Sequence, residues 1–176
     1  TPEFAGTSPE KLKVVTMGDQ LRLETDFHSR VLCVSGKDRS AILTAGKSGS
    51  AYFFSANTGR FITSTYYAEH YPQWWKNFYS TKPQNQWFFH KWKRLLPEQA
   101  YLRSAPDDRP QHVNQFGLGT KFPHLINGGS KNPDSNYYAA LIRTPFGDDY
   151  TLQFESLIHH RLDSHESLKV FDLIHE

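Results

Sequence analysis

The sequence has 176 residues, which is enough for a domain with a hydrophobic core of its own. Its net charge of +2 is only mildly basic and does not favour nucleic acid as the first choice of partner. No apolar run approaches the roughly 18 residues that cross a bilayer, and the opening residues lack the pattern of a signal peptide. We therefore expect no membrane partner and no leader in this chain.

Cys33 is the single cysteine, which excludes a disulfide framework and a thiolate metal cage. Its apolar neighbours Leu32 and Val34 predict a buried and unreactive thiol.

The first third of the chain alternates between helical and strand-like patterns. After a tail over residues 1–10, Thr16 and Asp19 have the spacing of a helix capping box. The helix that follows is expected to have an apolar face made of Met17, Leu21 and Leu23. Further predictions are a buried strand over 30–35, a helix over 38–45, a turn over 46–50, and strands over 51–55 and 60–66 joined by a hairpin loop at 57–59.

The rest of the chain is more irregular. A helix is expected from near Pro72 to residue 79, then a loop over 80–86, an aromatic and basic run over 87–96, and little regular structure over 104–136. A short helix over 136–143 precedes a break at 145–147. Asp148 or Asp149 is then expected to cap a helix that runs to about residue 162. Its inner face would consist of Leu152, Leu157 and Ile158. Residues 168–174 are expected to lead into another strand. Mixed elements with two crossovers indicate an α/β fold containing a parallel sheet.

Lys37 and Arg39 directly follow the predicted strand over 30–35. Open α/β sheets bind ligands at the carboxyl ends of their strands, and the start of a helix favours anions. Arg presents a planar fork to two oxygens, whereas Lys presents a compact charge. The pair could therefore bind one tetrahedral anion. The alternative is a solvated turn in which Arg39 pairs with Asp38 or another acid.

Other polar clusters carry weaker signals. His159, His160, His165 and His175 have no regular metal spacing, so we expect surface or packing roles. The run over 87–94 could stack bases or sugars, but such runs are more often half-buried strands. In the same way, one of Trp74 and Trp75 is expected in the core and the other at its rim. The stretch 46–48 reads Gly-Lys-Ser but lacks the upstream glycine of a phosphate-binding loop.

The order of several motifs resembles the bacterial alkaline phosphatases of the phosphate-irrepressible type. These enzymes belong to the alkaline phosphatase and nucleotide pyrophosphatase/phosphodiesterase superfamily. The resemblance rests on T16-M17-G18-D19-Q20-L21-R22-L23, V34-S35-G36-K37-D38-R39-S40-A41-I42-L43, G59-R60-F61-I62-T63-S64-T65-Y66-Y67, Y71-P72-Q73-W74-W75-K76-N77-F78, F122-P123-H124 and T144-P145-F146-G147.

The resemblance implies a layered fold of a parallel sheet with helices, and a hydrolase that uses two zinc ions and a threonine nucleophile. In that family the Lys and Arg of an S-x-K-x-R stretch bind the phosphoryl oxygens, which implies that role for Lys37 and Arg39. The nucleophile and the metal ligands are expected outside this chain, so no residue here is assigned to either. The substrate that the resemblance implies is a phosphate monoester, with a diester as the second candidate. A periplasmic or secreted location is the family expectation.

The chain is therefore interpreted as an internal segment of such an enzyme, inactive alone, whose partner is the remainder of the parent polypeptide. Residues 11–50 would belong to the catalytic core with the Lys/Arg clamp, 51–145 to an irregular accessory insertion, and 146–176 to a helix and strand that return to the core. The family's Gly-His after the clamp helix is Gly46-Lys47 here, which puts a role for this position in doubt. Two alternatives stay open: a non-catalytic binding module for glycans or single-stranded nucleic acid that uses the run over 87–94, and a degenerate relative with a structural role.

Overall fold

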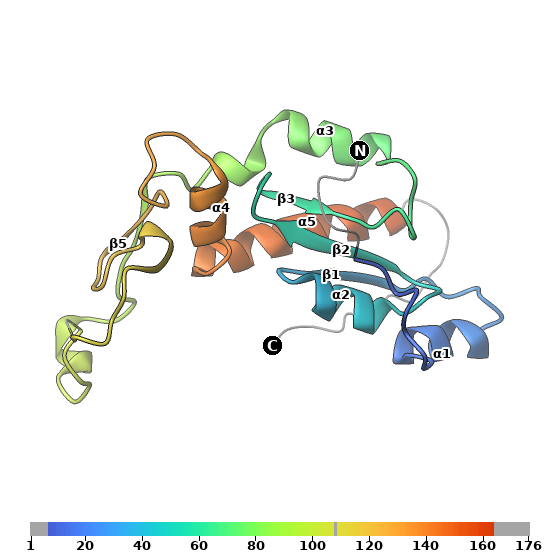
Figure 1. Ribbon diagram of the computed structural model, residues 1–176, viewed down its shortest axis with the longest axis horizontal. Helices are drawn as coiled ribbons and strands as arrows, with labels where there is room; N and C mark the ends of the chain where they lie inside the picture. Colours follow the sequence, from blue (N-terminus) through green and yellow to red (C-terminus); the bar gives the residue numbers. More distant parts are fainter. Residues whose placement is uncertain (1–6, 108, 164–176) are drawn as a thin grey trace. The chain divides into compact units, whose positions relative to one another are not determined.

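A computed structural model describes residues 7–107 and 109–163 of the chain. Internal contacts divide the chain into two units, which we describe separately. The described residues of the first unit fall within Thr1–Ser55, Arg60–Ser80 and Tyr150–Glu176, and those of the second within Ala56–Gly59 and Thr81–Asp149. Figure 1 colours the ribbon along the chain and labels most of its helices and strands. The assignment of 11–50, 51–145 and 146–176 to parts of a larger enzyme stays a prediction.

The first unit is built on a three-stranded sheet in the order β1-β2-β3. Strand β1 (Leu32–Ser35) pairs in parallel with β2 (Ser50–Ser55), and β2 pairs antiparallel with β3 (Arg60–Ile62). Helix α2 (Asp38–Ala45) connects the two parallel strands, as a parallel crossover requires. The mixed α/β class and these four elements confirm the sequence prediction. However, β1 begins two residues later than expected and is half-buried rather than buried, and β3 ends four residues earlier.

The central strand β2 is covered on both faces because its side chains alternate between them. Ala51 and Phe53 join Ala41, Ile42 and Ala45 of α2 in one buried cluster. Tyr52 and Phe54 face an aromatic layer on the other side. A strand that is buried on both faces reads as a continuous apolar run, as residues 51–54 do.

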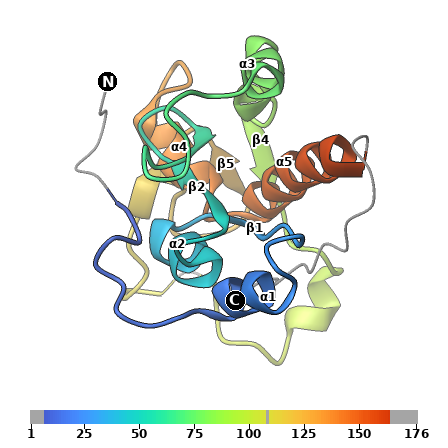
Figure 2. The same ribbon diagram turned by 90° about the vertical axis from the view of Figure 1, so that its right-hand side faces the viewer.

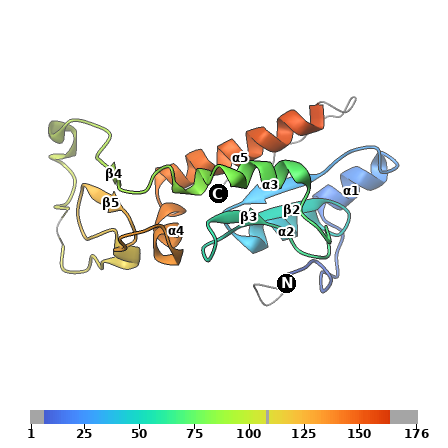
Figure 3. The same ribbon diagram turned by 90° about the horizontal axis from the view of Figure 1, so that it is seen from above.

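The aromatic layer is supplied by α3 (Gln73–Ser80) and α5 (Pro145–Asp163). Figure 3 shows these two helices running beside the sheet. Phe154 of α5 stacks on Phe61 with ring centroids 4.7 Å apart, and it meets Tyr52 edge-on at 5.5 Å. Trp75 Nε1 donates to the carbonyl oxygen of Phe61 at 2.7 Å. As predicted, Trp75 is buried while Trp74 is only half-buried.

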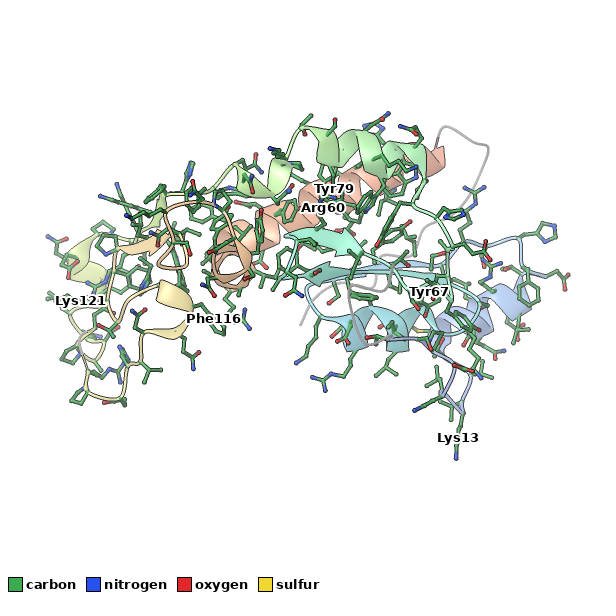
Figure 4. The ribbon with its side chains drawn as sticks, turned by 45° about the horizontal axis from the view of Figure 1, so that its top comes forward. Lys13, Arg60, Tyr67, Tyr79, Phe116 and Lys121 are labelled. Carbon is green, nitrogen blue, oxygen red and sulfur yellow. The ribbon has the colours of Figure 1, made fainter. Side chains whose placement is uncertain are left out.

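Strand β3 is held to α3 by both of its backbone groups at Phe61. Its N–H donates to the Tyr79 hydroxyl at 2.7 Å, and Tyr79 also contacts the hydroxyl of Tyr150 at 3.2 Å. The Arg60 guanidinium lies over the rings of Tyr79 and Trp75, at 5.3 and 5.6 Å from their centroids, and Figure 4 shows Arg60 beside Tyr79. Burial raises the pKa of the Tyr79 hydroxyl above its usual value, so this phenol stays neutral at physiological pH.

Helix α1 (Met17–Glu24) has the capping box that its sequence predicts. Thr16 Oγ1 accepts from the Asp19 N–H at 3.1 Å, and Asp19 Oδ2 accepts from the Thr16 N–H at 3.2 Å. The predicted apolar face is wrong, because Met17 and Leu23 are 61% and 48% exposed. The buried residues are Gly18 and Asp19. A small residue and a hydrogen-bonded carboxylate, rather than large apolar side chains, let α1 approach α2 closely.

Asp19 joins α1 to the loop that leaves α2. Its Oδ1 accepts from the N–H groups of Lys47 and Ser48 at 2.9 and 2.8 Å and from the Ser48 hydroxyl at 2.7 Å. Burial alone would raise the pKa of this carboxyl, but the hydrogen bonds from Ser48 and Thr16 outweigh it and hold the pKa below its usual value. In Figure 2 the short helices α1 and α2 lie next to each other.

The second unit contains a two-stranded antiparallel ladder of β4 (His90–Trp92) and β5 (His124–Ile126), with helix α4 (Ser135–Leu141). Three short 3-10 helices complete it: η1 (Pro83–Asn85), η2 (Glu98–Tyr101) and η3 (Gln115–Gly117). Asp134 caps α4 by accepting from the N–H groups of Asn136 and Tyr137, each at 3.0 Å. Tyr137 is fully buried and donates to the Gln84 carbonyl at 2.9 Å.

Helix α5 begins earlier than predicted. The sequence placed a break over 145–147, but Pro145 is the first residue of the helix, where a proline costs no hydrogen bond. The predicted inner face was also partly wrong. Leu152 is 47% exposed and Leu157 is half-buried, whereas Tyr150, Phe154 and Ile158 are buried at the helical spacing of four. The strand expected over 168–174 lies outside the described residues.

None of the helices in the described part of the chain combines the length and apolar character needed to cross a membrane.

Replacing Asp19 with Asn should lower the free energy of unfolding by about 2 kcal/mol, because one amide cannot accept all of the present hydrogen bonds. Since folding lowers the pKa of Asp19, its contribution is present above the unfolded pKa and is lost as the pH falls through the folded one. Urea unfolding should therefore show a difference between the two proteins at pH 7 that shrinks below a pH of about 4.

The control for this measurement is Asp26→Asn. Asp26 is exposed and has a left-handed backbone, which Asn tolerates. A loss of stability as large in the control as in Asp19→Asn would contradict the role given to the Asp19 hydrogen bonds.

Gly46→Ala should be the more costly of two matched glycine substitutions. Gly46 has φ +69°, and an added Cβ would lie 2.2 Å from Asp19 Oδ2. Gly119 has φ +84° with no heavy atom within 4 Å of an added Cβ. Thermal unfolding should give a cost of about 1 kcal/mol for Gly119→Ala from backbone strain alone, and about 3 kcal/mol or more for Gly46→Ala. Equal costs would show that the contact with Asp19 adjusts freely.

Candidate functional site

Lys37 and Arg39 lie where the parallel strand β1 ends and helix α2 begins. Strand β1 ends at Ser35, whose hydroxyl accepts from the Lys37 N–H at 3.2 Å and shapes the turn at Gly36. Lys37 and Arg39 are both exposed. The structure therefore places the two residues at the kind of position where sheets of this class bind ligands.

Lys37 occupies the N-cap position of α2, with φ −132° and ψ 133°. Ser, Thr, Asp and Asn are preferred at this position because their side chains accept a hydrogen bond from the first helical N–H groups. Lysine has no acceptor, and no side-chain hydrogen bond is made from the N-cap. Instead, Asp38 Oδ1 accepts from the Arg39 N–H at 2.8 Å. The first turn is thus stabilised from the position after the cap, and the cap itself is occupied by a cation.

The ion pairs found in the described part of the chain both belong to Arg94. Neither Lys37 nor Arg39 lies within 4 Å of a carboxylate among these residues. The alternative in which Arg39 pairs with Asp38 is therefore not what the structure has. Two cations at a spacing of two residues face solvent without a counter-charge, which is an arrangement that can bind an oxyanion.

No group of three His, Cys, Asp or Glu side chains in the described ranges is placed to hold a metal ion. His159 and His160 are exposed on α5, while His165 and His175 lie outside the described residues. The side chains described here do not fit a zinc site, and we derive no chemical step through a metal from them.

The aromatic and basic run over 87–94 is not a continuous strand. Phe89 has a left-handed backbone with φ 63°, which interrupts the alternation, and only His90–Trp92 form β4. Trp87 is buried against Phe146, and Trp92 packs on Phe122 with centroids 5.1 Å apart. The rings that a binding module would use for stacking are therefore engaged in packing.

A cavity of about 580 Å³ lies next to β4 within the second unit. Arg94 dominates its wall, where it pairs with Glu98, contacts Asp107 Oδ2 at 3.3 Å and lies over the Tyr101 ring. Asp107 Oδ2 also accepts from the Phe122 N–H at 2.7 Å, and these contacts hold the pKa of Asp107 below its usual value. The charges of Arg94, Glu98 and Asp107 are paired with one another and hold the loop over 93–107 against residue 122, while Lys93 and Arg109 add positive charge to the wall.

Cys33 is half-buried rather than buried as predicted. Its partial burial raises the pKa of the thiol to about 11, which agrees with the expected low reactivity. The loop over 46–48 follows α2 rather than leading a helix from a strand, so the rejection of a phosphate-binding loop is confirmed as well.

Two residues near the clamp were not found by sequence reasoning. Asp38 was considered only as a counter-charge, although it supplies the hydrogen bond that the N-cap lacks. Its Oδ2 accepts from the Thr7 hydroxyl at 3.2 Å. An aspartate at the first helical position is a sequence signal for a hydrogen bond to the first turn of the helix. Nothing in the sequence, however, connects Thr7 to a residue 31 positions away.

Comparison with known proteins identifies the family. No protein-family model matches the chain. It is 37% identical to alkaline phosphatase PhoV of Synechococcus elongatus over 84% of its length, and 40% identical to alkaline phosphatase PafA of Elizabethkingia meningoseptica over 83%. A crystal structure of PafA matches 80% of the chain with a TM-score of 0.67 and 34% identity. Most of the chain is therefore homologous to one segment of longer proteins named alkaline phosphatases. This confirms the resemblance that the sequence motifs indicated, and the fold class with it.

The chain spans about a quarter of these relatives, 26% of PhoV and 27% of PafA. It matches them as one segment of a longer enzyme. A further relative, 38% identical over 84% of the chain and covered to 27%, is named a calcium-transporting ATPase of Myroides odoratus.

Lys37→Asn should raise the free energy of unfolding by about 1 kcal/mol, because Asn can accept the hydrogen bond that Lys cannot. Urea unfolding measures this, with Lys47→Asn as the control, since Lys47 is also exposed but follows the helix. Equal changes in the two variants would argue against Lys37 as an unfavourable cap.

Proposed function

We propose that this chain is the phosphoryl-binding segment of a longer phosphate-ester hydrolase. Lys37 and Arg39 would bind the non-bridging oxygens of the phosphoryl group. The observation that carries the proposal is the pair of exposed cations, at the end of a parallel strand and the start of a helix, with no counter-charge among the described residues.

The two side chains would act by charge stabilisation. The guanidinium of Arg39 can donate to two oxygens at once, and the ammonium of Lys37 contributes a compact charge. Hydrolysis of a phosphate ester passes through a state in which charge is spread over these oxygens, so cations held in place before the reaction lower its barrier. A diester carries a substituent on one of these oxygens, so the lysine would favour monoesters.

One of the solved PafA structures, with a TM-score of 0.66 and 32% identity, supports this assignment. It is a variant in which a threonine is replaced by serine, and an asparagine, a lysine and an arginine are replaced by alanine. Its lysine and arginine are two positions apart, as Lys37 and Arg39 are. Its threonine precedes the lysine by more residues than precede Lys37 here. This spacing fits a threonine nucleophile, and a phospho-threonine intermediate, supplied from outside this segment.

The zinc ions of the proposed parent enzyme would also be held by other residues, because the described side chains offer no suitable donor set. Export to the periplasm or the medium is proposed on the family resemblance.

The binding-module alternative for glycans or single-stranded nucleic acid is not favoured, because Trp87 and Trp92 are used in packing and the relatives are alkaline phosphatases.

The test measures binding and turnover together. Inorganic phosphate is titrated into the chain at low ionic strength while the backbone amide resonances of residues 36–41 are followed by NMR. We expect a saturable shift that is weakened at least about tenfold in Lys37→Ala and in Arg39→Ala, since each removes a charged hydrogen bond worth about 1.5–3 kcal/mol. Lys47→Ala, which removes an equally exposed cation beyond the helix, should bind as the parent chain does.

The same four proteins are assayed for hydrolysis of p-nitrophenyl phosphate with added zinc. We expect no turnover from any of them. Turnover by the unsubstituted chain that is lost in both clamp variants would mean that this segment holds a complete site, contrary to the proposal. Phosphate binding that is unchanged in both clamp variants would remove Lys37 and Arg39 from the site.

A further inference from the structure

The carboxylate of Asp38 lies between the two cations in sequence and is the nearest candidate to neutralise them. An ion pair with either cation would compete with a phosphoryl group, because both are oxyanions attracted to the same charges. The structure shows no such pair. The reason must therefore lie in what the two carboxylate oxygens already bind.

Both oxygens of Asp38 are taken by donors that are not cations. Oδ1 accepts from the Arg39 backbone N–H at 2.8 Å, and Oδ2 accepts from the Thr7 hydroxyl at 3.2 Å. Asp38 and Thr7 are half-buried, whereas Lys37 and Arg39 are exposed. The carboxylate is thus held toward the protein while the cations extend into solvent.

The contact with Thr7 is the one that can be lost without changing the helix. The bond to the Arg39 N–H is local to the first turn and does not depend on the segment before α1. Thr7 comes from the segment before α1, 31 residues away, and its single hydroxyl fixes the second oxygen. Without that hydroxyl, Oδ2 becomes an unsatisfied acceptor beside two exposed cations.

We propose that Thr7 is a positioning residue for the anion site. Its hydroxyl holds the Asp38 carboxylate away from Lys37 and Arg39, and so keeps both cations open to an oxyanion. This inference rests on the proposed function of the clamp. It adds that the Asp38 carboxylate competes with an oxyanion for the two cations unless it is held back. The residue that holds it back, Thr7, comes from a separate segment of the chain.

The test is a double-mutant cycle with inorganic phosphate as the probe. In Thr7→Val, which keeps the shape and removes the hydroxyl, the released carboxylate should pair with the Arg39 guanidinium and weaken phosphate binding about threefold, as an exposed ion pair allows. Asp38→Asn keeps an acceptor for the Arg39 N–H but removes the charge, and should tighten binding about threefold. In the double variant, Thr7→Val should have no further effect, because no carboxylate remains to be released.

Two controls separate positioning from general loss of structure. Thr7→Ser keeps the hydroxyl and should bind phosphate as the unsubstituted chain does. Thr44→Val removes a hydroxyl from α2 itself, which donates to the Ser40 carbonyl at 2.8 Å, and should leave phosphate binding unchanged. An equal weakening by Thr7→Val with and without Asp38→Asn would overturn the proposal, because the effect would then not pass through the carboxylate.

A second readout does not depend on phosphate binding. Exchange of the Arg39 Nε–H with solvent should slow in Thr7→Val, where a carboxylate pairs with the guanidinium, and return to the original rate in the double variant. If no protein binds phosphate but this pattern is found, the proposed function fails while the restraint by Thr7 stands. If the exchange rate is the same in all variants, the restraint is disproved whatever the phosphate titration shows.

Discussion

The first unit depends on burying both faces of strand β2. On one face, Ala51 and Phe53 of the strand pack directly against Ala41, Ile42 and Ala45 of α2. On the other, Tyr52 and Phe54 contact the rings of Trp74, Tyr150 and Phe154 from α3 and α5. The start of α2, and with it the pair of cations, is fixed by the packing on the first face.

The carboxylate of Asp19 completes this arrangement at the opposite end of α2. It accepts hydrogen bonds from α1 and from the loop at 47–48, and the Tyr67 hydroxyl, labelled in Figure 4, donates to the Gly46 carbonyl at 2.7 Å. A short helix of eight residues has little stability of its own. Here its end is held by polar contacts and its face by packing, so its first turn can carry a lysine that is a poor cap. The helix can present an exposed lysine at its N-cap because other parts of the unit stabilise it.

The sequence was sufficient to predict elements whose local signals agree with their packing. The capping box at Thr16, the apolar run of β1, the boundaries of α2 and the hairpin at 57–59 all belong to this group. The errors came where tertiary packing decided. Met17 and Leu23 look like a core face, yet a glycine and an aspartate are the buried residues of α1. Pro145 looks like a break, yet it begins a helix.

The candidate site divides in the same way. Lys37 and Arg39 could be selected from the sequence, because two cations after an apolar strand are a local pattern. The hydrogen bond from Thr7 to Asp38 could not be predicted from the sequence, because it joins residues 31 positions apart through a single hydroxyl. Asp38 therefore looked like a partner of Arg39, while the structure gives its oxygens to other donors.

Strand β1 has a consequence for the behaviour of the isolated segment in solution. Among the described residues it is paired on one side only, and Leu32, Cys33 and Val34 are all half-buried. A strand edge of this kind presents unpaired N–H and C=O groups beside apolar side chains, which is a template for adding a strand from another molecule. Natural edge strands are usually protected by charges or proline, and β1, with the sequence Leu-Cys-Val-Ser, has neither. Self-association through this edge is therefore the hazard to watch when the segment is concentrated, and it limits the conditions under which a weak ligand can be studied.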